Sequence, residues 1–210
     1  GRTWISPRGG IWMSVILRPQ ISHENTIVIT LGAGVAVCMA IEDLYGITPG
    51  LKWPNDVMLG GRKLCGILAE MSSEGDLIKQ VILGIGLNAN VGRSSLPREL
   101  WANIAILCEE TGCHIDRTQL AAEILSRLEE IYLLISGGDT SAVTALWKKY
   151  TVTLGNRVAA KHCDGSSWEG TAADISSRGG LIIRLDTGEE KEVLSGEVTL
   201  SGVVITPCRL

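Results

Sequence analysis

The sequence lacks the residue patterns of several common functional classes. It has no C-x-x-C pair, and its only histidines are His23, His114 and His162, each in a polar, turn-like setting. These histidines give no grounds for a Ser-His-Asp or Cys-His mechanism. The one close zinc-type cluster, at residues 108–114, is weak. We therefore expect the six cysteines to be buried or half-buried thiols of a reduced, cytoplasmic protein rather than disulfide partners.

Positive charge is not in excess. There are 19 Lys and Arg residues against 23 Asp and Glu, which gives a net charge of -4 and argues against bulk binding of nucleic acid. Long apolar runs are also missing. The longest, residues 27–41, is shorter than the ~20 residues that a membrane span needs, so we expect a buried helix and no membrane partner. Since the sequence begins with Gly rather than Met, we expect the natural polypeptide to begin upstream.

The pattern of apolar residues and turn signals predicts an α+β protein. Residues 1–152 should form a mixed, mainly antiparallel sheet packed against helices. Residues 153–210 carry short β runs between turn signals and should form a small C-terminal β-barrel. We expect strands at 11–18, 51–53, 57–59, 63–71 and 78–90, and helices at 26–45, 97–110, 117–136 and 140–149, with Asp116 capping the third helix.

The N-terminal segment "GRTW" places a cation beside a large aromatic ring. The Trp4 ring is suited to stack on a nucleotide base, and the Arg2 guanidinium is suited to bind phosphate. The alternative interpretation is a solvated arginine and a core tryptophan.

Two lysines lie in apolar surroundings in "LKWPNDVMLGGRKLCGILAE". Strict alternation along the second strand predicts that Lys63 shares a face with Cys65, Ile67 and Ala69. A lysine on a covered face costs several kcal/mol unless an anion meets it. We therefore favour a phosphate or carboxylate site around Lys52 and Lys63. The alternative is that both ammonium groups reach solvent.

A third stretch, "GIGLN", puts Gly84 and Gly86 on one face of a strand, where a flat ligand could lie against the backbone. Asn88, together with Asn55 in the earlier stretch, would offer the paired donor and acceptor that an adenine edge requires. The segment is a poor dinucleotide fingerprint, and the sequence has no G-x-x-x-x-G-K-[ST] loop. The alternative is that these glycines only allow close packing of two layers.

The segments "GRTWISPRGGIWMSVILRP", "KWPNDVMLGGRKLCGILAE" and "VILGIGLNANV" occur in this order. Together they resemble the catalytic domain of the biotin protein ligase family, biotin–[acetyl-CoA-carboxylase] ligase, and the C-terminal segment resembles the small β-barrel of that family. The resemblance implies a catalytic fold similar to that of class II aminoacyl-tRNA synthetases.

The resemblance also implies an activity. Such enzymes use ATP and Mg²⁺ to convert biotin into biotinyl-5′-AMP with release of pyrophosphate. They then transfer the biotinyl group to one lysine of the biotin carboxyl carrier domain of a biotin-dependent carboxylase. Such proteins can also form homodimers. Nucleic acid would be a partner only through an N-terminal module upstream of this chain.

The resemblance assigns roles to residues of this chain. The catalytic residues would be Lys63, Lys52 and Arg2. ATP and adenylate would be bound by Arg2, Trp4, Lys52, Asn55, Asp56, Lys63 and Asn88. Biotin would be bound by Lys63, Gly66, Ile67, Leu68, Gly84 and Ile85, mainly through the backbone. No metal ligand is assigned.

The chain departs from the family pattern at two places. The family's loop, roughly G-R-G-R-x-G-R-x-W, is represented only by "GRTW", and the upstream Ser/Thr pair that grips biotin is absent. If these residues were the whole polypeptide, we would expect weak or no ligase activity. The segment "WANIAIL" also differs from the usual A-T-S-L pattern. Two alternatives remain: a related lipoate-type acyl-adenylating ligase, and a transcriptional repressor that responds to biotinyl-AMP.

Overall fold

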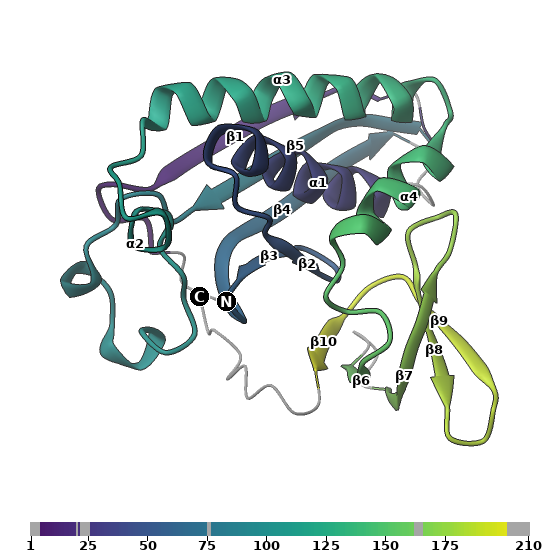
Figure 1. Cartoon of the computed structure of the whole chain (residues 1–210). Coiled ribbons are helices and arrows are strands. Elements are labelled where there is room, and N and C mark those ends of the chain that lie inside the picture. The colour runs from purple at the N-terminus through teal and green to yellow at the C-terminus, as the bar shows by residue number, and fades with distance from the viewer. Residues whose placement is uncertain (1–4, 20, 22–25, 75–76, 162–165, 201–210) are drawn as a thin grey trace.

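The computed structural model describes residues 5–19, 21, 26–74, 77–161 and 166–200. Within these ranges the chain forms two five-stranded sheets and four α-helices (Figure 1). The α+β class predicted from the sequence is confirmed. The two sheets belong to the N-terminal and C-terminal parts of the chain, and the segment between them is helical.

The first sheet has the strand order β1-β5-β4-β3-β2, and each neighbouring pair is antiparallel. Its long centre consists of β4 and β5. The short strands β2 and β3 continue the sheet beside only the first part of β4. The strands are β1 (Ile11–Leu17), β2 (Gly50–Lys52), β3 (Asp56–Leu59), β4 (Arg62–Glu74) and β5 (Leu77–Leu87). Strand β4 is longer than the predicted 63–71, because residues 72–74 also pair with β5.

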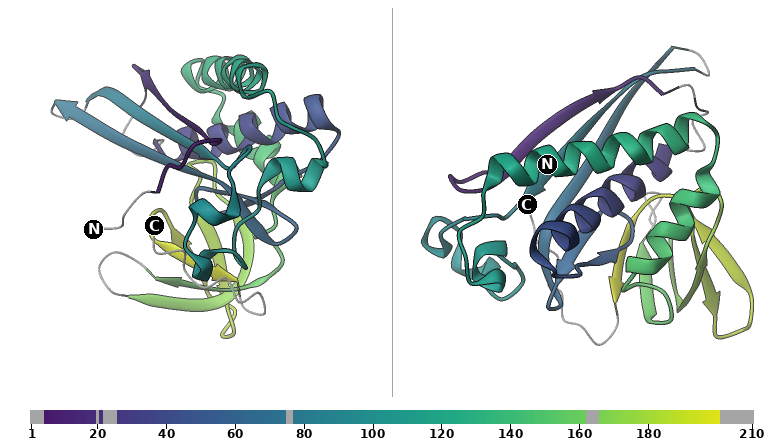
Figure 2. Two further views of the ribbon diagram at one scale, coloured as in Figure 1. Left: turned by 90° about the vertical axis from the view of Figure 1, so that its left-hand side faces the viewer. Right: turned by 45° about the horizontal axis from the view of Figure 1, so that its top comes forward.

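One face of this sheet is covered by helices. Helix α1 (Thr26–Tyr45) lies against the sheet, and α3 (Arg117–Ser136) packs on α1 (Figure 2). By length and composition α1 could cross a membrane, but most of it is buried in this core. The close crossing depends on Gly32, since a Cβ there would lie 2.5 Å from Ile131 Cγ2.

The helices that follow β5 were predicted with mixed success. The Asp116 side chain accepts hydrogen bonds from the backbone N–H groups of Thr118 and Gln119, as expected for the N-cap of α3. Helix α4 (Thr140–Tyr150) is also confirmed, and Asp139 is its N-cap, with a side chain that accepts from the Ala142 N–H.

The helix predicted at 97–110 is wrong. The 3₁₀ turn η2 (Arg93–Ser95) precedes this segment, which itself contains one 3₁₀ turn, η3 (Arg98–Leu100), and the start of the short helix α2 (Leu107–Thr111). Between them the chain is extended, because it pairs with the start of β4. The Lys63 N–H donates to the Asn103 carbonyl, and the Ala105 N–H donates to the Lys63 carbonyl, both at 2.8 Å. This pairing removes the backbone groups that a helix would need.

The second sheet has the order β10-β6-β7-β8-β9, again antiparallel throughout. The described ladders do not join β9 to β10, and closure of this sheet into the predicted small barrel stays a prediction. Its buried side includes Val158, Ala172 and Ile183. The strands are β6 (Arg157–Lys161), β7 (Ser167–Ile175), β8 (Leu181–Leu185), β9 (Glu190–Val193) and β10 (Glu197–Leu200). A domain boundary at residues 152 and 153 stays a prediction.

Candidate functional site

A single row of residues crosses the whole first sheet. Trp12 of β1 is opposite Gly86 of β5, which is opposite Gly66 of β4, then Asp56 of β3 and finally Lys52 of β2. Directly opposed residues of antiparallel strands project to the same face. We call this face, which also carries Gly84, the glycine face. The adjacent row, which includes Leu51, Val57 and Leu87, is buried on the opposite side.

A β-bulge brings Lys63 to the glycine face. Val57 is opposite Cys65, but the next residue, Met58, is opposite Lys63, so Leu64 is an extra residue in β4. The prediction that Lys63 shares a face with Cys65 is therefore wrong. The bulge reverses the side to which Lys63 points. Consistent with this direction, Lys63 Nζ lies 2.7 Å from Asp56 Oδ1.

The two lysines and one carboxylate form a charged cluster at the end of the row. The Lys52 residue is only 9% exposed, and burial lowers the pKa of its ammonium. The Asp56 carboxylate opposes this shift in pKa, and Lys63 adds to it. The Lys63 and Asp56 side chains are each 18% exposed. Asp56 Oδ1 is buried without a hydrogen bond of normal geometry, so its contact with Lys63 is an ion pair. These three side chains together carry one excess positive charge.

The two asparagines chosen from the sequence hold loops around this cluster. The Asn55 side-chain amide donates to the Ile67 carbonyl at 2.9 Å, and the Asn55 carbonyl accepts from the Ile67 N–H. The Asn88 amide donates to the Ala105 carbonyl at 3.2 Å. One N–H of each amide is therefore bonded to backbone. Contact of these groups with an adenine edge stays a prediction.

Two cavities are each lined by some of the predicted site residues, while Lys52, Asp56, Gly84 and Ile85 line neither of them. A small cavity of about 40 Å³ is lined by Lys63, Gly66 and Asn88, together with Trp12 and the 96–104 loop. A second cavity of about 370 Å³ is lined by Asn55, Ile67 and Leu68, and it also touches the start of α1 and residues 194–196.

The predicted biotin-binding residues do not all present side chains to the glycine face. Ile67 and Ile85 are opposite each other in the ladder and point into the core. Their side chains cannot form apolar walls on the glycine face, although their backbone can contact a ligand there. Gly84 and Leu68 are also opposite each other, and Leu68 is exposed.

Some lining residues were not identified from the sequence. The sequence predicts a strand at Trp12 but no role for it in the site. Trp12 joins the site because it is opposite Gly86 in the ladder, and this register is not visible in the sequence. Ile104 reaches the site only through its pairing with Lys63. Arg2 and Trp4 lie outside the described residues.

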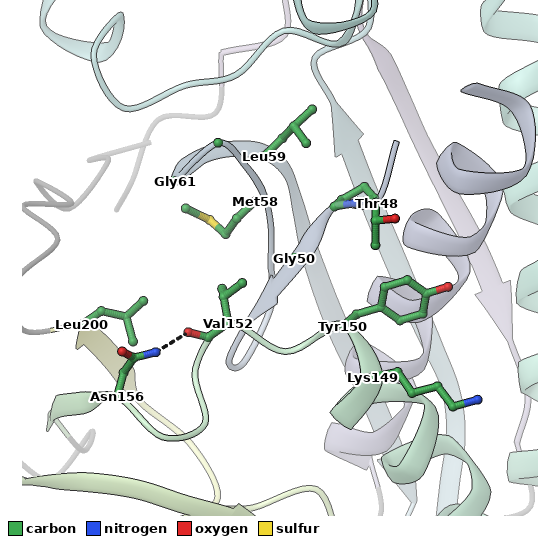
Figure 3. Close-up of a pocket in the computed structure, with 12 residues that line it drawn as sticks. Thr48, Gly50, Met58, Leu59, Gly61, Lys149, Tyr150, Val152, Asn156 and Leu200 are labelled. Atoms are coloured by element: carbon green, nitrogen blue, oxygen red, sulfur yellow. Dashed lines mark hydrogen bonds between the residues drawn. The ribbon is translucent and has the colours of Figure 1, made fainter. Parts of the chain in front are cut away.

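A further cavity of about 510 Å³ lies where the two sheets meet (Figure 3). Met58 and Leu59 line it from the β3 side, and Leu200 lines it from β10. The linker contributes Val152, whose carbonyl accepts a hydrogen bond from the Asn156 amide at 3.0 Å. None of the residues predicted for the site lines this cavity.

Sequence comparisons match both parts of the chain. The family profile described as "Biotin/lipoate A/B protein ligase family" matches residues 1–88, and the profile described as "Biotin protein ligase C terminal domain" matches residues 153–201. The chain is 36% identical over 200 residues to the "Bifunctional ligase/repressor BirA" of Bacillus subtilis, covering 95% of this chain and 61% of that protein. It is 32% identical to the "Biotin--[acetyl-CoA-carboxylase] ligase" of Mycobacterium tuberculosis, covering 93% and 71%.

Solved structures show the same fold. The chain is similar to "Biotin protein ligase from Aquifex aeolicus in complex with biotin and ATP", with a TM-score of 0.82 and 31% identity. That match covers 95% of this chain and 82% of the other. The chain spans about three fifths of the length of the Bacillus relative, 61%.

Proposed function

The chain belongs to the biotin protein ligase family, and we propose that its protein is an ATP-dependent biotin protein ligase. In the first step biotin and ATP would give biotinyl-5′-AMP and pyrophosphate. In the second step the biotinyl group would pass to one lysine of a biotin carboxyl carrier domain. The single observation that carries this proposal is the cluster of Lys52, Lys63 and Asp56 beside the glycines of the same sheet face.

The chemistry of adenylation accounts for the charges. A carboxylate oxygen of biotin attacks the α-phosphorus of ATP, the bond between that phosphorus and the bridging oxygen breaks, and pyrophosphate leaves with the electron pair. Two anions must therefore approach each other. Fixed cations in a site that excludes water lower the free energy of this approach, and positioning supplies much of the rest.

Lys63 and Lys52 are suited to this task in different ways. The ion pair with Asp56 holds the Lys63 ammonium on the glycine face, where it can contact a substrate anion as well. Lys52 is more deeply buried, and an incoming phosphate would stabilise its charged form. In the second step the carrier lysine attacks the acyl carbon, AMP leaves, and the amine loses a proton.

The glycine face offers a place for a flat ligand. Gly66 and Gly86 are opposite each other in the ladder, so no side chain rises from either position. A fused ring system could contact the backbone of both strands there. This arrangement supports the predicted roles of the 66–68 and 84–85 backbone in biotin binding.

The described residues offer few metal ligands. Across those residues no group of three or more His, Cys, Asp or Glu side chains is arranged to hold an ion. Asp56 is the one carboxylate of the cluster, and its Oδ1 lacks a normal hydrogen bond. This fits Mg²⁺ that is held mainly by the phosphates of the nucleotide, with at most one protein carboxylate. The ion would neutralise phosphate charge.

The names of the relatives support a carboxylase carrier domain as the acceptor of the biotinyl group. The Mycobacterium relative is named for acetyl-CoA carboxylase, and the carrier domain of such a carboxylase is the partner that we propose. Since the Bacillus relative is also named a repressor, a second candidate function is repression that responds to biotinyl-AMP. A cytoplasmic location agrees with the free thiols of the described cysteines, Cys38, Cys65, Cys108 and Cys113.

The test uses the natural full-length protein with ATP, Mg²⁺ and a purified carrier domain. We expect pyrophosphate release that depends on biotin, and a mass increase of the carrier by one biotinyl group. Lipoate in place of biotin should give neither product. Transfer of lipoate but not biotin would overturn the proposal in favour of the lipoate-type alternative. Binding of operator DNA that requires biotinyl-AMP would add the repressor role.

A further inference from the structure

Strand β2, which carries Lys52, has only three residues and is the last strand of its sheet. One side of β2 pairs with β3, and a strand this short has few hydrogen bonds to hold it. Its other side is covered by the linker that follows α4. Leu51 and Thr151 form a parallel bridge, and the Val152 N–H donates to the Leu51 carbonyl at 2.9 Å. The linker therefore serves as a further strand beside Lys52.

The Thr153 hydroxyl extends this contact to both sides of Lys52. It accepts a hydrogen bond from the Trp53 N–H at 2.9 Å and lies 3.5 Å from the Leu51 carbonyl, to which it can donate. These two backbone groups directly flank Lys52 in the sequence. Thr153 is fully buried, at 0% exposure, although it is polar. A buried hydroxyl with both of its bonding roles used is a specific positional constraint.

The second sheet adds another tether to the same segment. The Trp53 indole N–H donates to the Gly179 carbonyl at 3.0 Å, in the turn between β7 and β8. Gly179 has φ +85°, and a Cβ there would lie 2.8 Å from Ile27 of α1. The turn is thus fitted closely between α1 and Trp53. Residues that follow α4 therefore hold the Lys52 segment at two independent points, Thr153 and Gly179.

We propose that Thr153 is a positioning residue for Lys52, holding its backbone so that the ammonium stays on the glycine face beside Asp56 and Lys63. The catalytic consequence rests on the proposed ligase function. Lys52 is buried, and the free energy of a buried ammonium falls if its strand shifts so that the charge reaches water. The buried hydroxyl of Thr153 and the linker pairing oppose that shift. Thr151, Val152 and Thr153, about 100 positions later in the sequence, thereby hold the Lys52 ammonium at the proposed anion site.

The first measurement does not depend on activity. The rate of acetylation of each lysine by acetic anhydride, followed by mass spectrometry across pH, reports its titration. In the wild-type protein burial lowers the pKa of Lys52, with Asp56 opposing and Lys63 reinforcing the shift. In Thr153→Val, which keeps the shape and removes the hydroxyl, we expect the pKa of Lys52 to rise toward that of an ordinary lysine, so that the midpoint of its acetylation profile moves to higher pH. Thr153→Ser should restore the wild-type curve.

The second measurement is the steady-state dependence of pyrophosphate release on ATP and on biotin. Thr153→Val should lower kcat/KM for ATP by about 10- to 100-fold, the usual cost of a small misplacement of a catalytic group, with KM for biotin within about twofold of wild type. The matched control is Thr144→Val. Thr144 is also a buried threonine, but its hydroxyl donates only to the Ser141 carbonyl of its own helix.

The outcomes separate the two proposals. If Thr153→Val and Thr144→Val change Lys52 titration and ATP kinetics equally, or if neither variant changes them, Thr153 has only a structural role and the inference is overturned. If the wild-type protein releases no pyrophosphate, the ligase function fails, and the Lys52 titration of the variants still decides the positioning role. The melting temperature of each variant reports a fold defect separately. If such a defect caused the changes in Thr153→Val, Thr153→Ser would not selectively restore the Lys52 titration.

Discussion

Lys63 Nζ lies 2.7 Å from Asp56 Oδ1, and the two side chains share a face of the sheet only because Leu64 is an extra residue in β4. The ion pair is mostly shielded from water, and the Lys52 charge acts on it from the edge strand. The arrangement keeps two cations together with one carboxylate before any substrate arrives.

Replacing Lys63 by methionine should remove adenylate formation while the protein stays folded, because Lys52 still compensates the Asp56 charge. Loss of one group that stabilises transition-state charge typically lowers kcat by about 10²- to 10³-fold. Biotin-dependent pyrophosphate release measures the loss. The control is Arg62→Met, one residue earlier in β4, where the side chain pairs with Glu110. A folded Lys63→Met protein with normal pyrophosphate release would refute the role of Lys63.

Replacing Lys52 by methionine should stabilise the free protein and abolish productive ATP binding. Burial holds the pKa of Lys52 below that of an unfolded lysine, so at neutral pH its charge opposes folding. The gain for the variant should be about 1 kcal/mol, typical of removing an unfavourable functional group. Since the unfolded state binds more protons between the two pKa values, wild-type stability should rise with pH in that window and approach that of the variant.

Urea unfolding of both proteins at pH 7, 9 and 10.5 measures this difference. The exposed Lys161 of β6 provides the control, because Lys161→Met at the surface should change the free energy of unfolding only slightly. A Lys52→Met protein that is less stable than wild type at every pH would contradict the idea that the charge is kept at a cost to stability.

Substituting alanine for Gly84 should weaken biotin binding without unfolding the sheet. A Cβ at this position would lie 3.6 Å from the Leu68 carbonyl oxygen, an ordinary contact distance. We expect stability within about 0.5 kcal/mol of wild type and an affinity for biotin at least about tenfold lower, measured by calorimetry. Gly92→Ala is the matched control, since a Cβ there meets only Ser94 Oγ, at 3.8 Å. Unchanged biotin affinity in Gly84→Ala would place the ligand elsewhere.

Local signals predicted much of the fold. Helix α3 begins where its capping aspartate predicts, because the cap and its two backbone donors lie within four residues of each other. The hairpin at Gly60 and Gly61 is equally local, and both glycines adopt positive φ values of 56° and 74°. Such features need no information from distant parts of the chain.

Long-range pairing decided the features that the sequence did not reveal. The 97–110 segment is extended at its centre because Asn103 and Ala105 bond to Lys63, some 40 positions away. The face of Lys63 depends on one extra residue in a ladder with β3. The contact between Trp53 and Thr153 joins residues 100 positions apart. Two lysines in an apolar stretch indicated a site, but the arrangement of its side chains depends on the register between β3 and β4, which the sequence does not show.

Replacing Tyr150 by phenylalanine should destabilise the protein at neutral pH and less so in acid. The Tyr150 hydroxyl donates to Glu42 Oε2 and the Thr48 hydroxyl donates to Oε1, both at 2.7 Å. These bonds lower the pKa of Glu42. Their contribution is therefore complete above the unfolded pKa of Glu42 and is lost as pH falls through the folded one. We expect a loss of about 1 kcal/mol at pH 7.

Chemical unfolding at pH 7 and pH 3.5 checks this prediction, and the difference between wild type and Tyr150→Phe should shrink at the lower pH. Tyr132→Phe, at a half-buried position on α3, is the control and should show no such dependence. An equal loss at both pH values would mean that Tyr150 contributes through packing alone.

The pairing of the linker with β2 also determines how the chain can be divided. A polypeptide shortened to end near residue 150 would keep every strand of the first sheet but would uncover the outer backbone of β2, including the Leu51 carbonyl that now accepts from Val152. Bare strand edges recruit other chains. Such a fragment would be prone to aggregation through the very strand that bears Lys52, so the two parts of this protein are better expressed as one.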